Sequence, residues 1–314
     1  MIISIFFNNM KPNFDWKTAA IIFCVFCGIS LYADCACVLP STFTGTWWDS
    51  RTNGAITISS LQVTSGWELP LNTGYFSTYT CIRNDSTHWV FRSDQILPYT
   101  FGNNYYAVFC LQFTRITDNS YYYYIIADKE PIMSDKRVFL VDPVSENAYT
   151  LLSNYCNPQI GGPDGREYNV LVKANMQSLI HVNNFPDPLL GVFYYTVNNG
   201  TSTSCGAGSV WDGCYYNAAI NRTTVQFNYT QCATRLMGST NGLLYHVASV
   251  IYGSTYYTIL INADGTDTKF TCIATSQSGS TRSISTNPGG CAQGQVSTSR
   301  TVDTKSLLLT MTAY

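Results

Sequence analysis

The chain has 314 residues, which is enough for two ordinary domains or one large one. Hydrophobic residues make up 46% of the chain and charged residues only 11%, a balance that excludes intrinsic disorder. Lys and Arg number 17 and Asp and Glu number 19, and the resulting net charge of −2 argues against electrostatic binding of nucleic acid. Aromatic residues reach 14%, a share that suits half-buried β-strands.

The N-terminal residues have the pattern of a targeting segment. Lys11 and Lys17 precede an apolar run over residues 18–31, and the small residue Ala33 follows it. As a helix this run is roughly 21 Å long, shorter than a hydrocarbon core of about 30 Å. We therefore predict a signal peptide over residues 1–33 and a secreted, extracellular protein with no membrane span after cleavage. An uncleaved membrane anchor is the alternative.

The cysteine content supports export. Two of the 12 cysteines, Cys24 and Cys27, lie in the predicted signal, which leaves an even number for the exported protein. Such a set predicts up to about five disulfides formed in an oxidising compartment, with a connectivity that spacing alone does not determine. The spacings match no zinc finger or ribbon, so we expect no metal site. The candidate disulfide cysteines are Cys35, Cys37, Cys81, Cys110, Cys156, Cys205, Cys214, Cys232, Cys272 and Cys291.

Acceptor triplets for N-glycosylation agree with this location. Each consists of Asn, any residue but Pro, and Ser or Thr. The triplets begin at Asn84, Asn199, Asn221 and Asn228. Together with the signal and the cysteines they predict a secreted glycoprotein.

Strand patterns dominate the rest of the chain. Apolar and polar residues alternate over residues 55–63, as they do in a half-buried strand. The runs 108–116 and 121–126 flank a turn signal and predict a β-hairpin, and residues 245–261 repeat this plan. A helical pattern is found only over residues 169–180, between the two halves.

A recurring motif indicates two copies of one unit. It has the form Pro, four residues, Gly, one residue and two aromatics, and it begins at Pro40 and again at Pro186. We therefore predict an all-β fold: two cysteine-stapled antiparallel β modules, sandwich-like or barrel-like, in tandem after the signal peptide. The expected boundaries are a signal peptide at 1–33, module one at 35–160, a linker at 161–182, module two at 183–295 and a C-terminal tail at 296–314. Within this tail, residues 306–314 form either a last strand or an unstructured end.

Four motifs carry a resemblance to a known group of proteins. They are Cys37-Val38-Leu39-Pro40, the Phe43-x-Gly45-x-Trp47 motif, Cys81-Ile82-x-x-Asp85, and the hairpin from Cys110 to Ser120. In these motifs the chain resembles uncharacterised secreted cysteine-rich modules of invertebrate, molluscan-type extracellular proteins, some of which occur in the organic matrix of shells. This resemblance implies a structural or interaction role and brings no catalytic residues with it. The Phe43-x-Gly45-x-Trp47 motif is also similar to the first strand of lipocalins, whose barrels hold small apolar ligands.

Catalytic signatures are missing from the sequence. Its three histidines, His88, His181 and His246, lie outside any His-Glu-x-x-His pattern, and there is no Gly-x-Ser-x-Gly elbow. The acids Glu68, Glu130, Glu146 and Glu167 share no glycosidase signature. We therefore expect a non-enzymatic protein without a cofactor.

Three functions from different classes remain. The first is a structural or interaction component of an extracellular matrix, such as shell organic matrix, with matrix proteins or polysaccharide as partners. The second is a lipocalin-like carrier of a small apolar ligand, which requires an apolar cavity near Trp47. The third is a secreted hydrolase, which requires converging acids or a histidine dyad. Aromatic runs such as Tyr121 to Tyr124 suit sugar stacking, although strand alternation alone places Tyr121 and Tyr123 on a core face.

Overall fold

The structure is a computed structural model, and the chain divides into two compact units, Met1–Ala36 and Cys37–Tyr314. It describes residues 37, 39–99, 102–145, 149, 151–180, 184–205, 208–214, 222–228, 236–264 and 268–314. The predicted signal peptide over residues 1–33 therefore lies outside the described residues, as do Cys35, Cys232 and Asn221.

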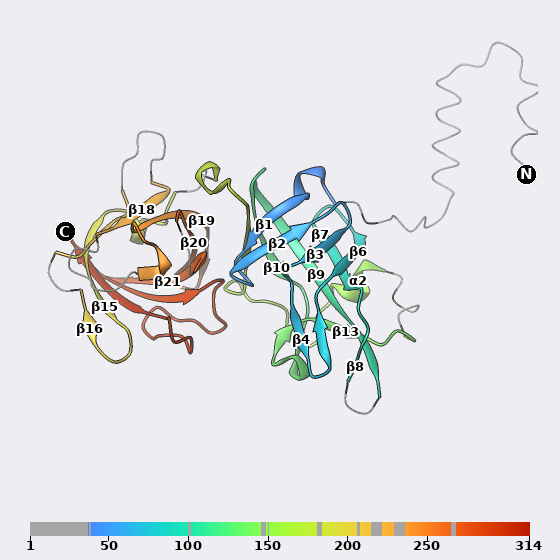
Figure 1. Cartoon of the computed structure of the whole chain (residues 1–314). Helices are drawn as coiled ribbons and strands as arrows, with labels where there is room; N and C mark the ends of the chain where they lie inside the picture. Colours follow the sequence, from blue (N-terminus) through green and yellow to red (C-terminus); the bar gives the residue numbers. More distant parts are fainter. Residues whose placement is uncertain are drawn as a thin grey trace, which may run out of the picture. The chain divides into compact units, whose positions relative to one another are not determined.

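The first half of the second unit is a closed antiparallel barrel, barrel one, drawn in blue to green in Figure 1. Each strand pairs with the next strand in chain order, and the last pairs with the first. This is an up-and-down barrel, in which closure leaves no free sheet edge. Its strands are β1 (Gly45–Asp49), β2 (Gly54–Ile58), β3 (Gln62–Ser65), β6 (Tyr79–Asn84), β7 (His88–Ser93), β9 (Asn104–Thr117), β10 (Ser120–Ile125) and β14 (Asn169–Lys173).

The second half forms barrel two with the same topology, drawn in yellow to red in Figure 1. Its first and last strands pair over six residue positions, from Phe193 opposite Ala313 to Asn198 opposite Leu308. The strands are β15 (Val192–Asn198), β17 (Val210–Asp212), β18 (Thr224–Phe227), β19 (Leu243–Tyr252), β20 (Thr255–Asn262), β21 (Phe270–Ser278), β22 (Thr281–Pro288) and β23 (Leu308–Ala313). The predicted all-β fold of two tandem antiparallel modules is confirmed, and both modules are barrels.

Short elements complete the described residues. The minor strands are β4 (Leu69–Leu71), β5 (Gly74–Phe76), β8 (Leu97–Pro98), β11 (Lys129–Glu130), β12 (Lys136–Arg137), β13 (Phe139–Val141) and β16 (Thr203–Ser204). The helical elements are α2 (Leu152–Tyr155) and the 3₁₀ turns η2 (Ser41–Phe43), η3 (Pro131–Met133), η5 (Gln177–Leu179), η6 (Asp187–Leu189) and η7 (Leu236–Gly238). In the described residues no helix is long and apolar enough to cross a membrane.

The recurring Pro–Gly–aromatic motif has the same position in both barrels. In each copy a 3₁₀ turn, η2 or η6, precedes the first strand and a glycine follows the turn, with φ of +125° at Gly45 and +131° at Gly191. Each turn offers a carbonyl to a buried tryptophan: Trp47 Nε1 donates to Phe43 O at 2.7 Å, and Trp211 Nε1 donates to Leu189 O at 3.1 Å. The turn and the tryptophan thus close one end of each barrel.

The two predicted hairpins are present but do not correspond to each other. The hairpin β9–β10 supplies the sixth and seventh strands of barrel one, whereas β19–β20 supplies the fourth and fifth strands of barrel two. The similar sequences at these hairpins therefore do not mark equivalent positions of the two barrels.

The module boundaries differ from those expected. The expected linker, 161–182, contains β14, which closes barrel one, and the expected tail, 296–314, contains β23, which closes barrel two. The predicted helix at 169–180 is wrong, because its first residues form this strand. Strand β14 is buried on both faces, with Leu171 inside barrel one and Val170 and Val172 packed outside it, so it lacks the alternation of a half-buried strand.

Disulfides are present, as predicted, with one departure. The described bonds are Cys37–Cys81, Cys110–Cys156 and Cys272–Cys291, and Cys205 is also disulfide-bonded. Both Cys110 and Cys272 lie on the sixth strand of their barrels. Cys214 instead is a free, exposed thiol, so its predicted bond is not formed. An even cysteine count cannot show whether two Cα atoms come within the roughly 7 Å that a bond needs.

The outer face of β14 packs against the outer face of barrel two. Val170 and Val172 share one buried cluster with Ile259 and Phe270 of barrel two. The Tyr168 hydroxyl, fully buried, reaches the backbone oxygens of Ala248 (3.1 Å) and Tyr257 (2.8 Å).

The β1–β2 turn adds backbone contacts across the same junction. Asn53 Oδ1 accepts from the amides of Lys269 (3.0 Å) and Phe270 (2.8 Å), and Ser50 O accepts from Gly290 N (2.8 Å). A Cβ at Gly289, whose φ is +84°, would meet the backbone oxygen of Ser50 at 2.8 Å, so only glycine fits at this approach.

These contacts predict that Tyr168→Phe lowers the free energy of unfolding by about 1–3 kcal/mol, because the one hydroxyl proton shared by two buried carbonyls is lost. The control is Tyr75→Phe, at a tyrosine that is 61% exposed, and it should change stability by less than about 0.5 kcal/mol. Denaturant unfolding of both variants measures the difference. Equal stability of the two variants would contradict the role given to Tyr168.

Candidate functional site

A buried carboxylate organises the interior of barrel one. Alternation along β1 points Trp47 and Asp49 inward, and the Asp49 side chain has no exposed surface. Its Oδ2 accepts from Trp67 Nε1 at 2.7 Å, and its Oδ1 accepts from the Tyr123 hydroxyl at 2.9 Å and from Arg51 N at 3.0 Å. The carboxylate thus joins β1, β10 and the segment before β4.

The Arg51 side chain lies over this group. Its Nε is 3.9 Å from Asp49 Oδ2, and its guanidinium lies 5.0 Å from the Trp67 ring centroid and 4.8 Å from that of Phe109. Burial raises the pKa of Asp49, and the charge of Arg51 opposes this rise. Burial, followed by the Asp49 charge, also raises the pKa of Tyr123 well above its usual value.

Beyond Arg51 the barrel opens into a pocket of about 660 Å³, which we call the mouth pocket. It lies beside the β1–β2 turn, at the end of barrel one away from η2, and the buried side chains of Phe109 and Ile125 contribute to its wall. Its charged lining residues are Arg51, Glu68, Asp135, Lys136, Arg137 and Glu167.

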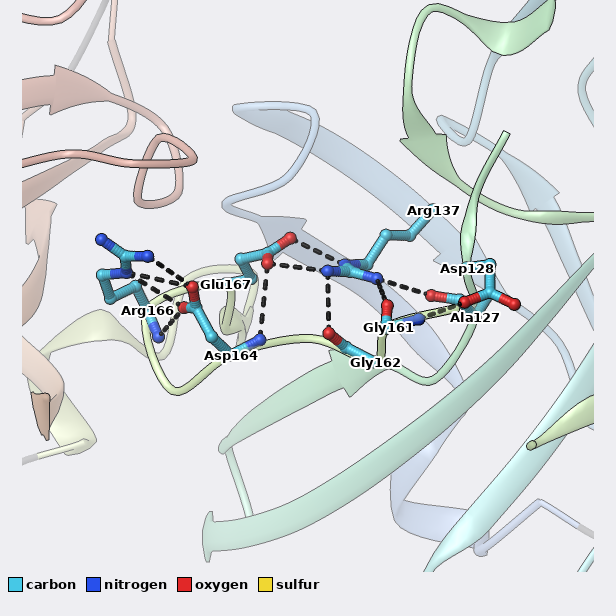
Figure 2. A network of polar contacts seen from close by, with 8 residues as sticks. All are labelled: Ala127, Asp128, Arg137, Gly161, Gly162, Asp164, Arg166 and Glu167. Atoms are coloured by element: carbon cyan, nitrogen blue, oxygen red, sulfur yellow. Dashed lines mark hydrogen bonds and ion pairs between the residues drawn. The ribbon is translucent and has the colours of Figure 1, made fainter. Parts of the chain in front are cut away.

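Arg137 fixes one side of the mouth pocket (Figure 2). It binds Glu167 in the bidentate manner, Nε to Oε2 at 2.7 Å and Nη2 to Oε1 at 2.8 Å. Its remaining donors reach the carbonyls of Ala127 (2.7 Å), Gly161 (2.8 Å) and Gly162 (3.0 Å). Arg137 and Glu167 therefore neutralise each other and hold the loop before β14 in place.

Two aspartates stabilise the same loop: Asp128 binds it from outside, and Asp164 is part of it and binds Arg166 (Figure 2). Asp128 accepts from the amides of Gln159 (2.6 Å), Ile160 (2.9 Å) and Gly161 (2.8 Å). Partial burial acts to raise the pKa of Asp128, but these donors outweigh it and lower the pKa below its usual value. The pKa of Asp164 is likewise lowered, since hydrogen bonds from Arg166 outweigh its partial burial.

The histidines and acids considered for catalysis, for which no catalytic role was predicted, are mostly dispersed. His88 Nδ1 pairs with Asp85 at 3.2 Å in an exposed turn, and His246 Nε2 lies 2.7 Å from Ser249 Oγ with the histidine buried. Glu68 and Glu167 share the mouth pocket, but Glu130 binds the Ile132 amide instead. His181 and Glu146 lie outside the described residues. In the described part of the chain no group of three or more His, Cys, Asp or Glu could hold a metal.

The glycosylation candidates lie near turns and strand ends. Asn84 ends β6 and is half-buried, and its Nδ2 donates to Asp85 O at 3.3 Å. Asn199 is exposed, and its Oδ1 accepts from the amides of Thr201 (3.0 Å) and Ser202 (2.9 Å). Asn228 is exposed after β18.

The residues that build the mouth pocket carry no recognisable pattern in the sequence. Arg51, Lys136 and Arg137 belong to no motif, nor does Asp49, which pairs with Arg51, and the topology brings the two segments together. One signal was available: Asp49 occupies an inward position of an alternating strand, where a charged residue needs partners.

Comparison with known proteins gives one partial match. Residues 183–306 match a family model described as a domain of unknown function, DUF7042. This part of the chain covers barrel two up to the residues before β23, so barrel two is similar to that family. No curated protein and no solved structure matches the chain.

We predict that Asp49→Ala lowers the free energy of unfolding by about 3–5 kcal/mol, because the buried Trp67 and Tyr123 donors and the Arg51 charge lose their partner. The control is Asp118→Ala, which removes an exposed pair with Arg115 and should cost less than about 1 kcal/mol. Thermal and denaturant unfolding measure both. A loss at Asp49 no larger than that at Asp118 would show that the buried carboxylate is dispensable.

The lowered pKa of Asp128 predicts a pH-dependent loop. Since the folded pKa lies below the unfolded value of about 3.9, the contribution of Asp128 is present above that value and is lost as pH falls through the folded pKa. Hydrogen exchange should show the amides of residues 159–161 losing protection in acid, and at neutral pH in Asp128→Ala. Asp303→Ala, on barrel two, should leave these amides protected. Unchanged protection in Asp128→Ala would refute the assignment.

Proposed function

We propose that the protein is a secreted, non-enzymatic glycoprotein that serves as a structural or interaction component of an extracellular matrix, such as the organic matrix of a shell. The observation that carries this proposal is that large side chains fill the interior of both barrels, each of which contains disulfide bonds. A filled barrel is a rigid body that offers its surface and its mouth, rather than its interior, to a partner.

The interior of barrel one supports this reading. Phe43 packs against Tyr121 with ring centroids 4.5 Å apart and against Phe113 at 5.2 Å. At the other end Trp67 contacts Phe91 at 5.5 Å and Phe109 at 5.9 Å. Trp47, which packs against Phe43 and Tyr121, has no exposed surface, so the space that an apolar ligand would take beside it is occupied by protein.

Barrel two is filled in the same way. Its fully buried side chains include Trp211, Leu260, Ile284 and Met311. Trp211 contacts Phe227 edge-on, with ring centroids 4.9 Å apart. His246 and Ser249 belong to this packed barrel, where Phe185 lies 5.1 Å from the imidazole, so their pairing favours a structural role over a hydrolytic one.

Disulfides and glycosylation triplets support export. The described bonds join segments 44, 46 and 19 residues apart, and such bonds persist in oxidising compartments. The exposed turn at Asn199 suits attachment of a glycan, because a sugar on this side chain displaces no packed residue.

A lipocalin-like carrier is the second candidate. The up-and-down topology of barrel one and its open mouth pocket favour it. In this case the ligand would lie beside Arg51 and Phe109, and not at the closed end beside Trp47.

Two measurements on the full chain, secreted from a eukaryotic host, test the proposal. We expect the protein to sediment with insoluble extracellular matrix and to leave a fluorescent fatty acid unbound. Quantitative mass spectrometry of the source tissue should find it in the insoluble matrix. Recovery from soluble fluid alone, together with stoichiometric binding of the fatty acid, would replace the matrix role with the carrier role.

A further inference from the structure

We propose that the mouth pocket of barrel one binds an acidic sugar, with its carboxylate between Arg51 and Lys136 and its hydroxyl groups on the surrounding acids and amides. This inference deepens the proposed function and rests on it, since a matrix polysaccharide would supply such a sugar.

Two cations of the pocket are incompletely paired: within the described part of the chain Lys136 has no carboxylate partner, and Arg51 has only Asp49, at 3.9 Å. Lys136 has no carboxylate within 4.0 Å among the described residues, and the buried Nη2 of Arg51 has no hydrogen-bond acceptor there. The carboxylate nearest to Arg51 is Asp49, whose oxygens already accept from Trp67 and Tyr123. Burial lowers the pKa of Lys136, and the positive charge of Arg51 lowers it further. A bound anion would relieve this repulsion between the two cations.

The third cation, Arg137, is not available to a ligand. Its donors are all used by Glu167 and by three backbone carbonyls, as Figure 2 shows. This pair leaves Arg51 and Lys136 as the anion-binding part of the pocket.

The other polar residues of the pocket wall indicate which functional groups the ligand has besides its carboxylate. Glu68 and Asp135 are exposed on the pocket wall, and they repel any anion, so a ligand needs further groups besides its carboxylate to bind there. Hydroxyl groups, by contrast, donate to carboxylates and accept from amides. Thr52, Asn169 and Gln293 add such polar groups, and their side chains form no hydrogen bond with other described residues.

Size and the apolar part of the lining agree with a sugar. The volume of about 660 Å³ lies within the roughly 300–1,000 Å³ typical of small-ligand pockets. Leu69, Phe109 and Ile125 provide an apolar wall on which the C–H face of a sugar ring can pack. A uronic acid unit combines the carboxylate, the hydroxyl groups and this face in one molecule.

Calorimetry on the full chain tests the assignment with three probes. Oligogalacturonate should bind; its methyl ester, which keeps the rings and loses the charge, should bind at least about tenfold more weakly. Octanoate, which keeps the carboxylate without hydroxyl groups, should not bind. Binding of octanoate in preference to oligogalacturonate, equal binding of the methyl ester, or no binding of any probe would overturn the proposal.

Substitutions of two lysines test whether the sugar binds in the mouth pocket. Lys136→Gln, at an exposed side chain, should weaken oligogalacturonate binding about tenfold, and Lys305→Gln, on barrel two, should not weaken it. Oligogalacturonate binding that is unchanged in Lys136→Gln would show that the sugar binds elsewhere. The sedimentation assay separates the two proposals: wild type that sediments with matrix but binds no oligogalacturonate retains the matrix role and loses the pocket assignment.

Discussion

The buried carboxylate of Asp49 is the constraint on which barrel one depends. A charge without exposed surface is tolerated only with partners, and here Trp67, Tyr123 and the backbone of Arg51 supply them from three separate segments. Each partner is thereby fixed relative to β1. Because Arg51 also forms the wall of the mouth pocket, the interactions that hold the barrel together also position the group that faces a ligand.

Much of the fold was predictable because most strands are buried on one face only. Alternation identified both hairpins, and the Pro–Gly–aromatic motif marked the start of each barrel, whereas residues 55–63, expected as one strand, form most of β2, a turn and the start of β3. The strand β14 was missed because it has a core on each side, inside barrel one through Leu171 and outside it through Val170. A run buried on both faces is hydrophobic throughout and carries no period of two.

The site was far less predictable than the fold. Arg51, Glu68, Lys136 and Asn169 come from four segments, and only barrel closure brings them to one rim. None of them belongs to a local motif, so sequence spacing carries no signal for their proximity. The cysteines show the same limit: their number predicted disulfides, whereas the free thiol of Cys214 depends on distances in the folded chain.

Strand β14 also determines the result of proteolytic cleavage between the two halves of the chain. It follows the loop over residues 157–167, so a protease that cleaves this loop would leave β14 covalently attached to the second half. Its hydrogen bonds to β1 and β10 would still belong to the first half. The two fragments would then remain together as a complementing pair, because barrel one of the first fragment is completed only by β14 of the second.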